Sequence, residues 1–289
     1  MTQKSPGRWR LALSQLIDQL RMPNAAATVY PYRRLRNFIL DALTEGRRKP
    51  LAHLLFEVDI AQARERLEEH RRRSGETIAM TSYVAKSFAC AIETDKRMQG
   101  YRKGRSRLVV FDDVDLTFIV EREWEGEALP VFHIVRGAQR KSANDIQQEL
   151  RRAKQAPLGA EGPLTALEMC FFQLPRFLRR PVWFLIRHNP YWFKDVAGTA
   201  VVTSIGMFTS GASVGISISP MTLTLVIGSI GKKLALRDGQ VVESEVIHLN
   251  LSVDHEVIDG APLVRFVDRF KTILQEGTAL APLAECPPA

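Results

Sequence analysis

The chain has 289 residues, of which 45% are hydrophobic, so it is long enough to bury a full core as one large domain or two ordinary ones. Lysine and arginine total 40 against 32 acidic residues, and the net charge of +8 favours anionic partners such as a nucleotide cofactor, a nucleic acid or a lipid headgroup. No apolar run reaches the ~18 residues that cross a bilayer.

The cysteines and the N-terminus bear on the compartment. The cysteines are few, widely spaced and without a CxxC pattern, which supports neither a disulfide framework nor a zinc site and favours a reducing compartment. They are Cys90, Cys170 and Cys286. Because residues 1–23 also show no signal-peptide core, we expect a cytoplasmic protein.

Periodic apolar positions dominate the first third of the chain. They predict helices at residues 8–21, 33–43, 59–73 and 81–92. Residues 51–58 are typical of a strand. Asp59 is placed to cap the third helix, and Gly75 follows its basic end as a stop signal.

The rest of the chain is richer in β-structure. Strands are predicted at residues 107–120, 129–135, 197–204, 213–218, 222–230 and 246–253. Ser142 and Asp145 have the spacing of a capping box before a helix, and Asp238-Gly239 predicts a type I′ hairpin. A last apolar helix follows Gly260. The order of elements predicts an α+β fold.

His255 stands between the last predicted strand and the last predicted helix, in the segment Asp254 to Gly260. An imidazole accepts a thiol or hydroxyl proton near neutral pH, so this HxxxDG segment is a candidate general-base site. A purely local interpretation is also open. Asp259 and Gly260 precede Pro262 in an ordinary helix N-terminal pattern, and His255 would then be a polar residue at a strand end.

Four segments in sequence order resemble the catalytic domain of the dihydrolipoamide acyltransferases of 2-oxoacid dehydrogenase complexes, and their relative chloramphenicol acetyltransferase. These segments are Phe56 to Asp59, Val114 to Val135, Thr203 to Phe208 and Asp254 to Gly260. The similarity spans about residues 33–275 and implies a chloramphenicol acetyltransferase-like fold, a mixed sheet flanked by helices. We therefore expect an N-terminal helical extension at 1–32, a catalytic domain at 33–276 and a tail at 277–289.

The resemblance implies a CoA-dependent acyltransferase that uses coenzyme A or acyl-CoA as substrate and has each active site between subunits of a homotrimer or a higher assembly of trimers. His255 is then the general base for the thiol of CoA or of a dihydrolipoyl donor. Asp259 holds the site by pairing with a basic residue. Thr203 supplies a hydroxyl to the oxyanion, with Ser204 as the alternate. Strand propensity alone also explains a threonine in this segment.

Three features depart from that family. No lipoyl or partner-binding domain precedes the match, so we expect no covalently bound lipoyl group on this chain, and either an acyl-CoA donor or a lipoyl-bearing protein in trans. Residues 156–195 form an insertion rich in aromatic residues and arginine. Its interpretations are a membrane-surface or acyl-chain contact through 164–193, a subunit contact, or a helix pair packed on its own domain. Glu256 stands where the dehydrogenase acyltransferases commonly have arginine.

Two other function classes are open from sequence. A catalytically silent trimeric scaffold derived from the acyltransferase core is one, and the intact His255, Asp259 and Thr203 argue against it. A nucleic-acid binder is the other, prompted by clustered arginines. These clusters fall mostly at predicted helix ends and loops, where basic residues complement the helix dipole, so we expect no nucleic-acid partner. The residues that contact CoA are not identified by the sequence, and no metal site is expected.

Overall fold

The computed structural model describes residues 28, 36–124, 127–155, 171, 173–206, 211–237, 239–280 and 286. The chain divides into two units, residues 1–33 and 34–289, and the fold described below belongs to the second unit. The predicted helix at 8–21 lies outside the described residues.

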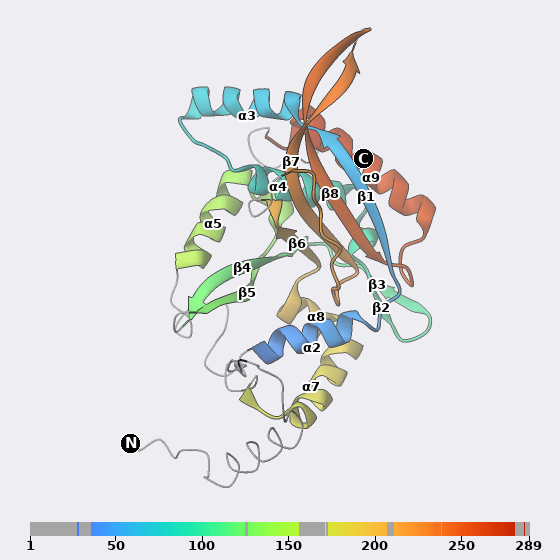
Figure 1. Cartoon of the computed structure of the whole chain (residues 1–289). Coiled ribbons are helices and arrows are strands. Elements are labelled where there is room, and N and C mark those ends of the chain that lie inside the picture. Colours follow the sequence, from blue (N-terminus) through green and yellow to red (C-terminus); the bar gives the residue numbers. More distant parts are fainter. Residues whose placement is uncertain are drawn as a thin grey trace. The chain divides into compact units, whose positions relative to one another are not determined.

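A six-stranded mixed sheet, in the order β1-β8-β7-β6-β4-β5, forms the centre of this unit (Figure 1). The strands are β1 (Leu51–Asp59), β4 (Leu116–Trp124), β5 (Glu127–Val135), β6 (Ala200–Ser204), β7 (Leu223–Arg237) and β8 (Gln240–Asp254). Strand β6 runs parallel to both of its neighbours, and all the other pairings are antiparallel. A separate two-stranded sheet contains β2 (Tyr101–Lys103) and β3 (Arg107–Val109). The predicted α+β class with a mixed sheet is confirmed.

Helices lie on both faces of the sheet. They are α2 (Asn37–Gly46), α3 (Ala61–Ser74), α4 (Met80–Thr94), α5 (Ala143–Gln155), α7 (Arg176–His188), α8 (Pro190–Ala197) and α9 (Gly260–Glu276), with short 3-10 turns at Lys96–Gln99, Ala138–Arg140 and Thr278–Leu280. Over the described part of the chain, none of these helices has the length and apolar character of a membrane span.

The main core lies between the sheet and helices α4 and α9. Phe88 of α4 makes edge-to-face contacts with Phe266 and Phe270 of α9, and all three side chains are buried. Alternate residues of the central strands, such as Leu223 and Leu225, belong to the same cluster. Because successive strand residues point to opposite faces, the residues between them face away from this core, toward α2, α7 and α8.

Local capping signals fix the helix boundaries where the sequence predicts them. The backbone N–H of Ser142 donates to Asp145 Oδ2 at 3.0 Å, and the N–H of Asp145 donates to Ser142 Oγ at 3.0 Å, which is a reciprocal capping box. Asp59 Oδ1 accepts from the N–H of Ala61 at 3.0 Å as α3 begins. Gly75 ends this helix with φ +74°.

The predicted strand at 213–218 is wrong, and the predicted strand at 107–120 is divided into β3 and β4. Residues 213–218 lie instead against a bulge in β7, where the register shifts between Ile227 and Ile230. Ser213 accepts from the backbone N–H of Ser229 at 2.9 Å, and Asn250 Nδ2 donates to the carbonyl of Gly215 at 2.9 Å. These single bonds hold the segment without a strand ladder.

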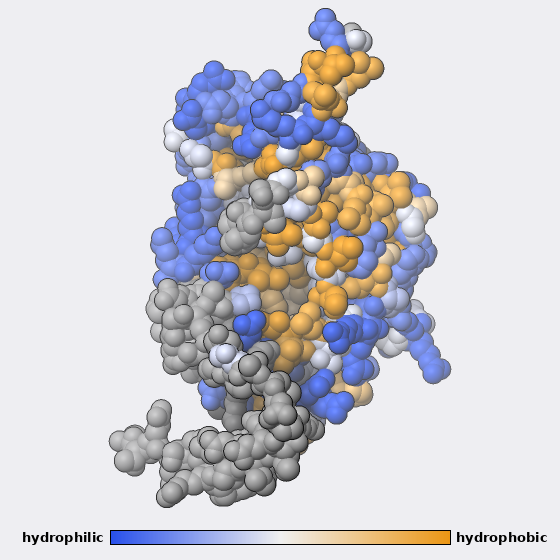
Figure 2. Space-filling view, in the orientation of Figure 1, coloured by the Kyte–Doolittle hydropathy of each residue, from blue (hydrophilic) through white to orange (hydrophobic). Residues whose placement is uncertain are grey.

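The β7–β8 hairpin extends well beyond its neighbours in the sheet. Its two strands pair as far as Arg237 with Gln240, and Gly239 in the turn has φ +77°, which confirms the predicted hairpin. The projecting part has apolar side chains on its surface, visible in Figure 2 as the orange patch just below the blue tip of the arm. Leu234, Leu236 and Val241 are each about 70% exposed there.

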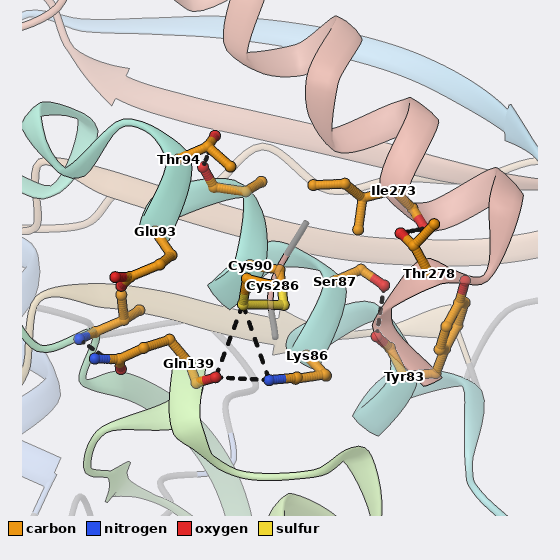
Figure 3. The surroundings of a disulfide bond; sticks show 12 residues. Tyr83, Lys86, Ser87, Cys90, Glu93, Thr94, Gln139, Ile273, Thr278 and Cys286 are labelled. Carbon is orange, nitrogen blue, oxygen red and sulfur yellow. Dashed lines mark hydrogen bonds between the residues drawn. A yellow bond between two sulfur atoms is a disulfide. The ribbon is translucent and has the colours of Figure 1, made fainter. Parts of the chain in front are cut away.

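The expectation that the cysteines form no disulfide is wrong. Cys90, on the buried side of α4, is bonded to Cys286 (Figure 3). Lys86 lies beside this bond and donates to the carbonyl of Gln139 at 2.7 Å. The two cysteines are 196 positions apart, so their pairing depends on the fold rather than on a local pattern. The disulfide removes the cysteine argument for a reducing compartment, and a cytoplasmic location stays a prediction.

Candidate active site

His255 follows the last residue of β8, at the turn that leads into α9. Its backbone N–H donates to the carbonyl of Pro50 at 2.9 Å, at the entrance to the neighbouring strand β1. Its side chain is 51% exposed. The main chain of His255 is therefore held between two strands, while its imidazole remains accessible to a substrate.

Asp254 organises this turn. Its Oδ2 accepts from Lys49 Nζ at 2.6 Å, and its Oδ1 accepts from the backbone N–H of Glu256 at 3.1 Å. The Asp254 side chain is only 5% exposed, so the ion pair is largely withdrawn from water. Lys49 stands just before β1, whose first residue pairs with Asp254. The sequence alone indicates no role for Lys49 or Asp254, since only the pairing of β1 with β8 brings them together.

Asp259 lies near His255 but is open to solvent. Its Oδ1 is 3.9 Å from Nδ1 of His255, beyond hydrogen-bond distance, and its side chain is 86% exposed. Asp259 is the N-cap residue of α9, and its carbonyl accepts from the N–H of Leu263 at 3.1 Å. Among the described residues, no lysine or arginine lies within ion-pair distance of Asp259. Within one protomer Asp259 therefore occupies the N-cap position without a side-chain capping bond, and it has no basic partner among the described residues.

Thr203 and Ser204 end the short parallel strand β6, in the middle of the sheet. They pair with Val226 and Ile227 of β7, and both side chains are half-buried. Gly206 follows them at a close backbone approach. A Cβ atom at position 206 would lie 2.1 Å from the carbonyl oxygen of Gly228, so only glycine fits there without a shift of the backbone.

The structure does not bring His255 and Thr203 together within one protomer. Leu223 pairs with Val253, two residues before His255, whereas Thr203 pairs with Val226. This register separates the two site residues by about five positions along β7, which is roughly 15 Å of strand. Within one protomer the predicted general base and the predicted hydroxyl donor are therefore too far apart to act on the same substrate atom.

A large apolar cavity of about 650 Å³ lies on the sheet face opposite the main core, and Thr203 is one of its lining residues. Phe38 and Leu43 of α2, Phe132 of β5 and Phe193 of α8 contribute to its walls. Such a volume is typical of a small-molecule site. The cavity also contains buried polar groups, which the pattern of apolar residues in the sequence did not predict.

Thr224 of β7 provides one of these polar groups. Thr224 is 1% exposed and lines the cavity, and its Oγ1 has no hydrogen-bond partner among the described residues. Ser217 lines the same cavity, and its buried Oγ is likewise without a partner there. Buried hydroxyls are costly when they are unpaired, so these two oxygens are suited to bind a polar group of a bound molecule.

The insertion forms the outer wall of this cavity. Helix α8 packs on the domain through Phe193, which belongs to a small buried cluster with Tyr101 and Val201. Trp183 of α7 lines the 650 Å³ cavity and also two adjoining clefts of about 350 and 410 Å³. Its Nε1 donates to Asp41 Oδ2 of α2 at 2.9 Å. The interpretation as helices packed on their own domain therefore applies to this part of the insertion; residues 156–170 and 172 lie outside the described residues.

The fold matches solved acyltransferase cores. A probable dihydrolipoamide acetyltransferase from Listeria monocytogenes aligns with a TM-score of 0.65 at 18% identity, over 91% of this chain and 100% of that chain. The dihydrolipoamide acetyltransferase of Azotobacter vinelandii aligns with a TM-score of 0.65 at 16% identity, over 97% and 99%. The cubic core of a pyruvate dehydrogenase multienzyme complex gives a TM-score of 0.66 at 14% identity, again over 97% and 99%. These structural similarities show that the protein has the fold of the dihydrolipoamide acyltransferase cores.

Comparison of sequences identifies the family of the chain as well as its fold. The model of the family "2-oxoacid dehydrogenases acyltransferase (catalytic domain)" matches residues 24–169 and 189–281, so the chain belongs to this family and the predicted resemblance is confirmed. The chain is 25% identical over 231 residues to the lipoamide acyltransferase component of the branched-chain alpha-keto acid dehydrogenase complex of Bacillus subtilis, covering 78% of this chain and 47% of that protein.

A second relative is the mitochondrial dihydrolipoyllysine-residue succinyltransferase component of the 2-oxoglutarate dehydrogenase complex of Saccharomyces cerevisiae. It is 23% identical over 248 residues, which cover 84% of this chain and 46% of that protein. The chain thus spans about half the length of the curated relatives it matches. The unmatched stretch, residues 170–188, contains the whole of α7.

Proposed function

We propose that the protein transfers an acyl group between CoA and a thiol, either a dihydrolipoyl group or another small acceptor, with His255 as the general base. The observation that carries this proposal is the half-exposed imidazole of His255 on a main chain fixed by Pro50 and Asp254. The relatives named as lipoamide acyltransferase and succinyltransferase components support it. Where a lipoyl group is the donor, a lipoyl-bearing protein is the proposed partner.

In this proposal, side chains of this protein assist each step of the reaction. Nδ1 of His255 is the ring nitrogen near Asp259, so Nε2 is the nitrogen that accepts the proton of the attacking thiol. The thiolate forms a bond to the thioester carbonyl carbon, and the hydroxyl of Thr203, or of Ser204, donates to the resulting oxyanion. The carbon–sulfur bond of the donor then breaks, and its thiolate takes the proton back from the imidazolium.

The working unit in this proposal is a homotrimer with its sites between subunits. Its support is the distance between His255 and Thr203 within a protomer, together with the solvent-exposed Asp259, which lacks a basic partner there. In the Azotobacter vinelandii enzyme, a serine, a histidine and an asparagine studied for their catalytic role are 52 and 4 positions apart. Thr203, His255 and Asp259 have the same two separations. The apolar β7–β8 arm is suited to contact a neighbouring subunit.

The 650 Å³ cavity is the proposed place of the apolar part of the acyl substrate. It extends along the sheet from Thr203, so a thioester carbonyl near that hydroxyl would leave its chain against apolar walls. Each methylene buried there contributes about 0.8 kcal/mol to binding. Thr224 and Ser217 would bind a polar atom of the substrate.

Complementation between two inactive variants tests the proposal. His255→Ala and Thr203→Val should each abolish most acyl transfer from acyl-CoA to dihydrolipoamide. After unfolding and refolding as an equal mixture, about a quarter of the sites would combine an intact His255 from one subunit with an intact Thr203 from the next, and activity should recover to that level. No recovery with assembled mixed trimers would refute a shared site, and full activity of His255→Ala would refute the base.

A further inference from the structure

Helix α7 is attached to the domain by its polar residues rather than by its apolar ones. Arg179 is 3% exposed in its side chain and donates from Nε and Nη2 to the two carboxylate oxygens of Asp41, at 2.7 and 3.1 Å. Trp183 donates to the same carboxylate, and Arg187 pairs with Glu45 at 3.0 Å. Positions 179, 183 and 187 recur every four residues and form one side of the helix.

The opposite side of α7 is apolar and faces solvent. The exposed fractions are 69% for Phe177, 48% for Leu178, 39% for Val182, 53% for Phe184 and 55% for Leu185. A surface helix normally turns such residues toward its own core. Here the buried Arg179–Asp41 pair, together with the half-buried Arg187–Glu45 pair, fixes the opposite orientation, so the fold itself presents the apolar side of α7 outward.

Positive charge flanks this apolar side. Arg176 and Arg180 line the groove between α7 and α2, beside Phe177 and Phe184. Arg176 has a hydrogen bond to Thr44 Oγ1 at 3.3 Å, and neither arginine has an acidic partner within ion-pair distance among the described residues. Both guanidinium groups are therefore available to an anion outside the domain.

We propose that α7 is a peripheral docking helix for an anionic lipid surface. Its phenylalanine and leucine side chains enter the boundary between headgroups and acyl chains, while Arg176 and Arg180 contact lipid phosphates. An apolar face bordered by arginines is the composition that such interfacial helices have. The docked helix lies in the plane of the surface, with the cavity that it covers on the protein side.

A second copy of the chain fits this face less well. A self-complementary contact would bring the arginine-bordered faces of two copies into one interface, and the like charges gathered there are unfavourable. An anionic lipid surface instead complements those charges. The chain's net charge of +8 acts in the same direction.

The inference is independent of the proposed acyl transfer, because α7 falls within the stretch that the family model leaves unmatched. It can therefore be tested by binding alone. The experiment is co-sedimentation of the full chain with vesicles of phosphatidylcholine, with and without phosphatidylglycerol, at low and high salt.

Three variants make the test specific. Phe177→Ser with Leu185→Ser removes apolar contacts from the docking face. Arg176→Gln with Arg180→Gln removes its charges and should weaken binding to anionic vesicles about fivefold for each arginine. The matched control is Leu108→Ser with Val264→Ser, which removes two apolar side chains that are 45% and 49% exposed elsewhere on the domain.

We expect the wild type and the control to sediment with anionic vesicles. Salt, or omission of phosphatidylglycerol, should reduce the bound fraction. The Phe177/Leu185 variant should no longer sediment with the vesicles. Sedimentation of that variant at the wild-type level would overturn the proposal, as would failure of the wild type to bind. A smaller particle mass for the Phe177/Leu185 variant than for the wild type in ultracentrifugation, without any vesicle binding, would assign the face to self-association instead.

Discussion

Replacement of Lys49 by methionine tests the mechanism that holds the main chain of His255. The change leaves the Asp254 carboxylate, only 5% exposed, without the ammonium group that lies 2.6 Å from it. Removing one partner of a fully buried pair costs about 3 to 5 kcal/mol, and the 23% exposure of Lys49 places the expected loss in unfolding free energy lower, at about 2 to 4 kcal/mol. Acyl transfer should fall as well, because Asp254 also fixes the N–H of Glu256 beside the base.

A double-mutant cycle separates the pair from its surroundings. Asp254→Asn keeps an acceptor for the N–H of Glu256 and leaves Lys49 able to hydrate, so its expected cost is about 1 to 2 kcal/mol. The double variant should be no less stable than Lys49→Met alone, which gives a coupling energy of about 1 to 3 kcal/mol. Urea unfolding followed by circular dichroism measures all four proteins.

Arg48→Met is the matched control for this cycle. Arg48 pairs with Glu45 at 3.4 Å, but its side chain is 52% exposed, so the expected loss is below about 0.5 kcal/mol. If Lys49→Met lies within this same small range, the buried pair does not hold the turn and the reasoning fails.

Two further predictions concern the region of the disulfide. Cys286→Ser should lower the free energy of unfolding by about 2 to 4 kcal/mol, because the bond closes a loop across 196 positions, and a shift in the midpoint of chemical denaturation measures the loss. Burial lowers the pKa of Lys86 from 10.5 to about 8, against the charges of Asp145 and Glu93, which raise it. Between these two pKa values the unfolded chain binds more protons than the native one, so the free energy of unfolding should rise by about 1 to 2 kcal/mol from pH 8 toward pH 10. A flat stability profile in the wild type would contradict this assignment. So would a Lys86→Met variant whose stability rises with the same slope as that of the wild type.

Features that depend on neighbouring residues were predictable from the sequence. The reciprocal bonds of Ser142 and Asp145, and the positive φ of Gly75, follow from chemistry within a few positions of the chain. The strand–turn–helix arrangement around His255 was predictable for the same reason, since an alternating pattern ends there and a helical one begins. The identity of the candidate base thus required no knowledge of the fold.

Features that depend on distant contacts were not predictable. Residues 213–218 have the composition of a strand, but a bulge in β7 offers them single hydrogen bonds instead of a ladder. The ion pair of Lys49 with Asp254 spans 205 positions and the disulfide spans 196, so neither has a local signal. The outward apolar side of α7 was not predicted from its pattern either, because one buried and one half-buried carboxylate contact decide which side of that helix meets the domain.

Trp183 has a consequence for selectivity. Its indole ring lines the apolar cavity and both adjoining clefts, and its Nε1 donates a hydrogen bond to Asp41. A residue outside the stretch that the family model matches therefore contributes to the wall of the cavity proposed for the acyl chain. We expect that a smaller side chain at position 183 would enlarge this cavity and let the protein accept longer acyl chains, while His255 and Thr203 kept their places.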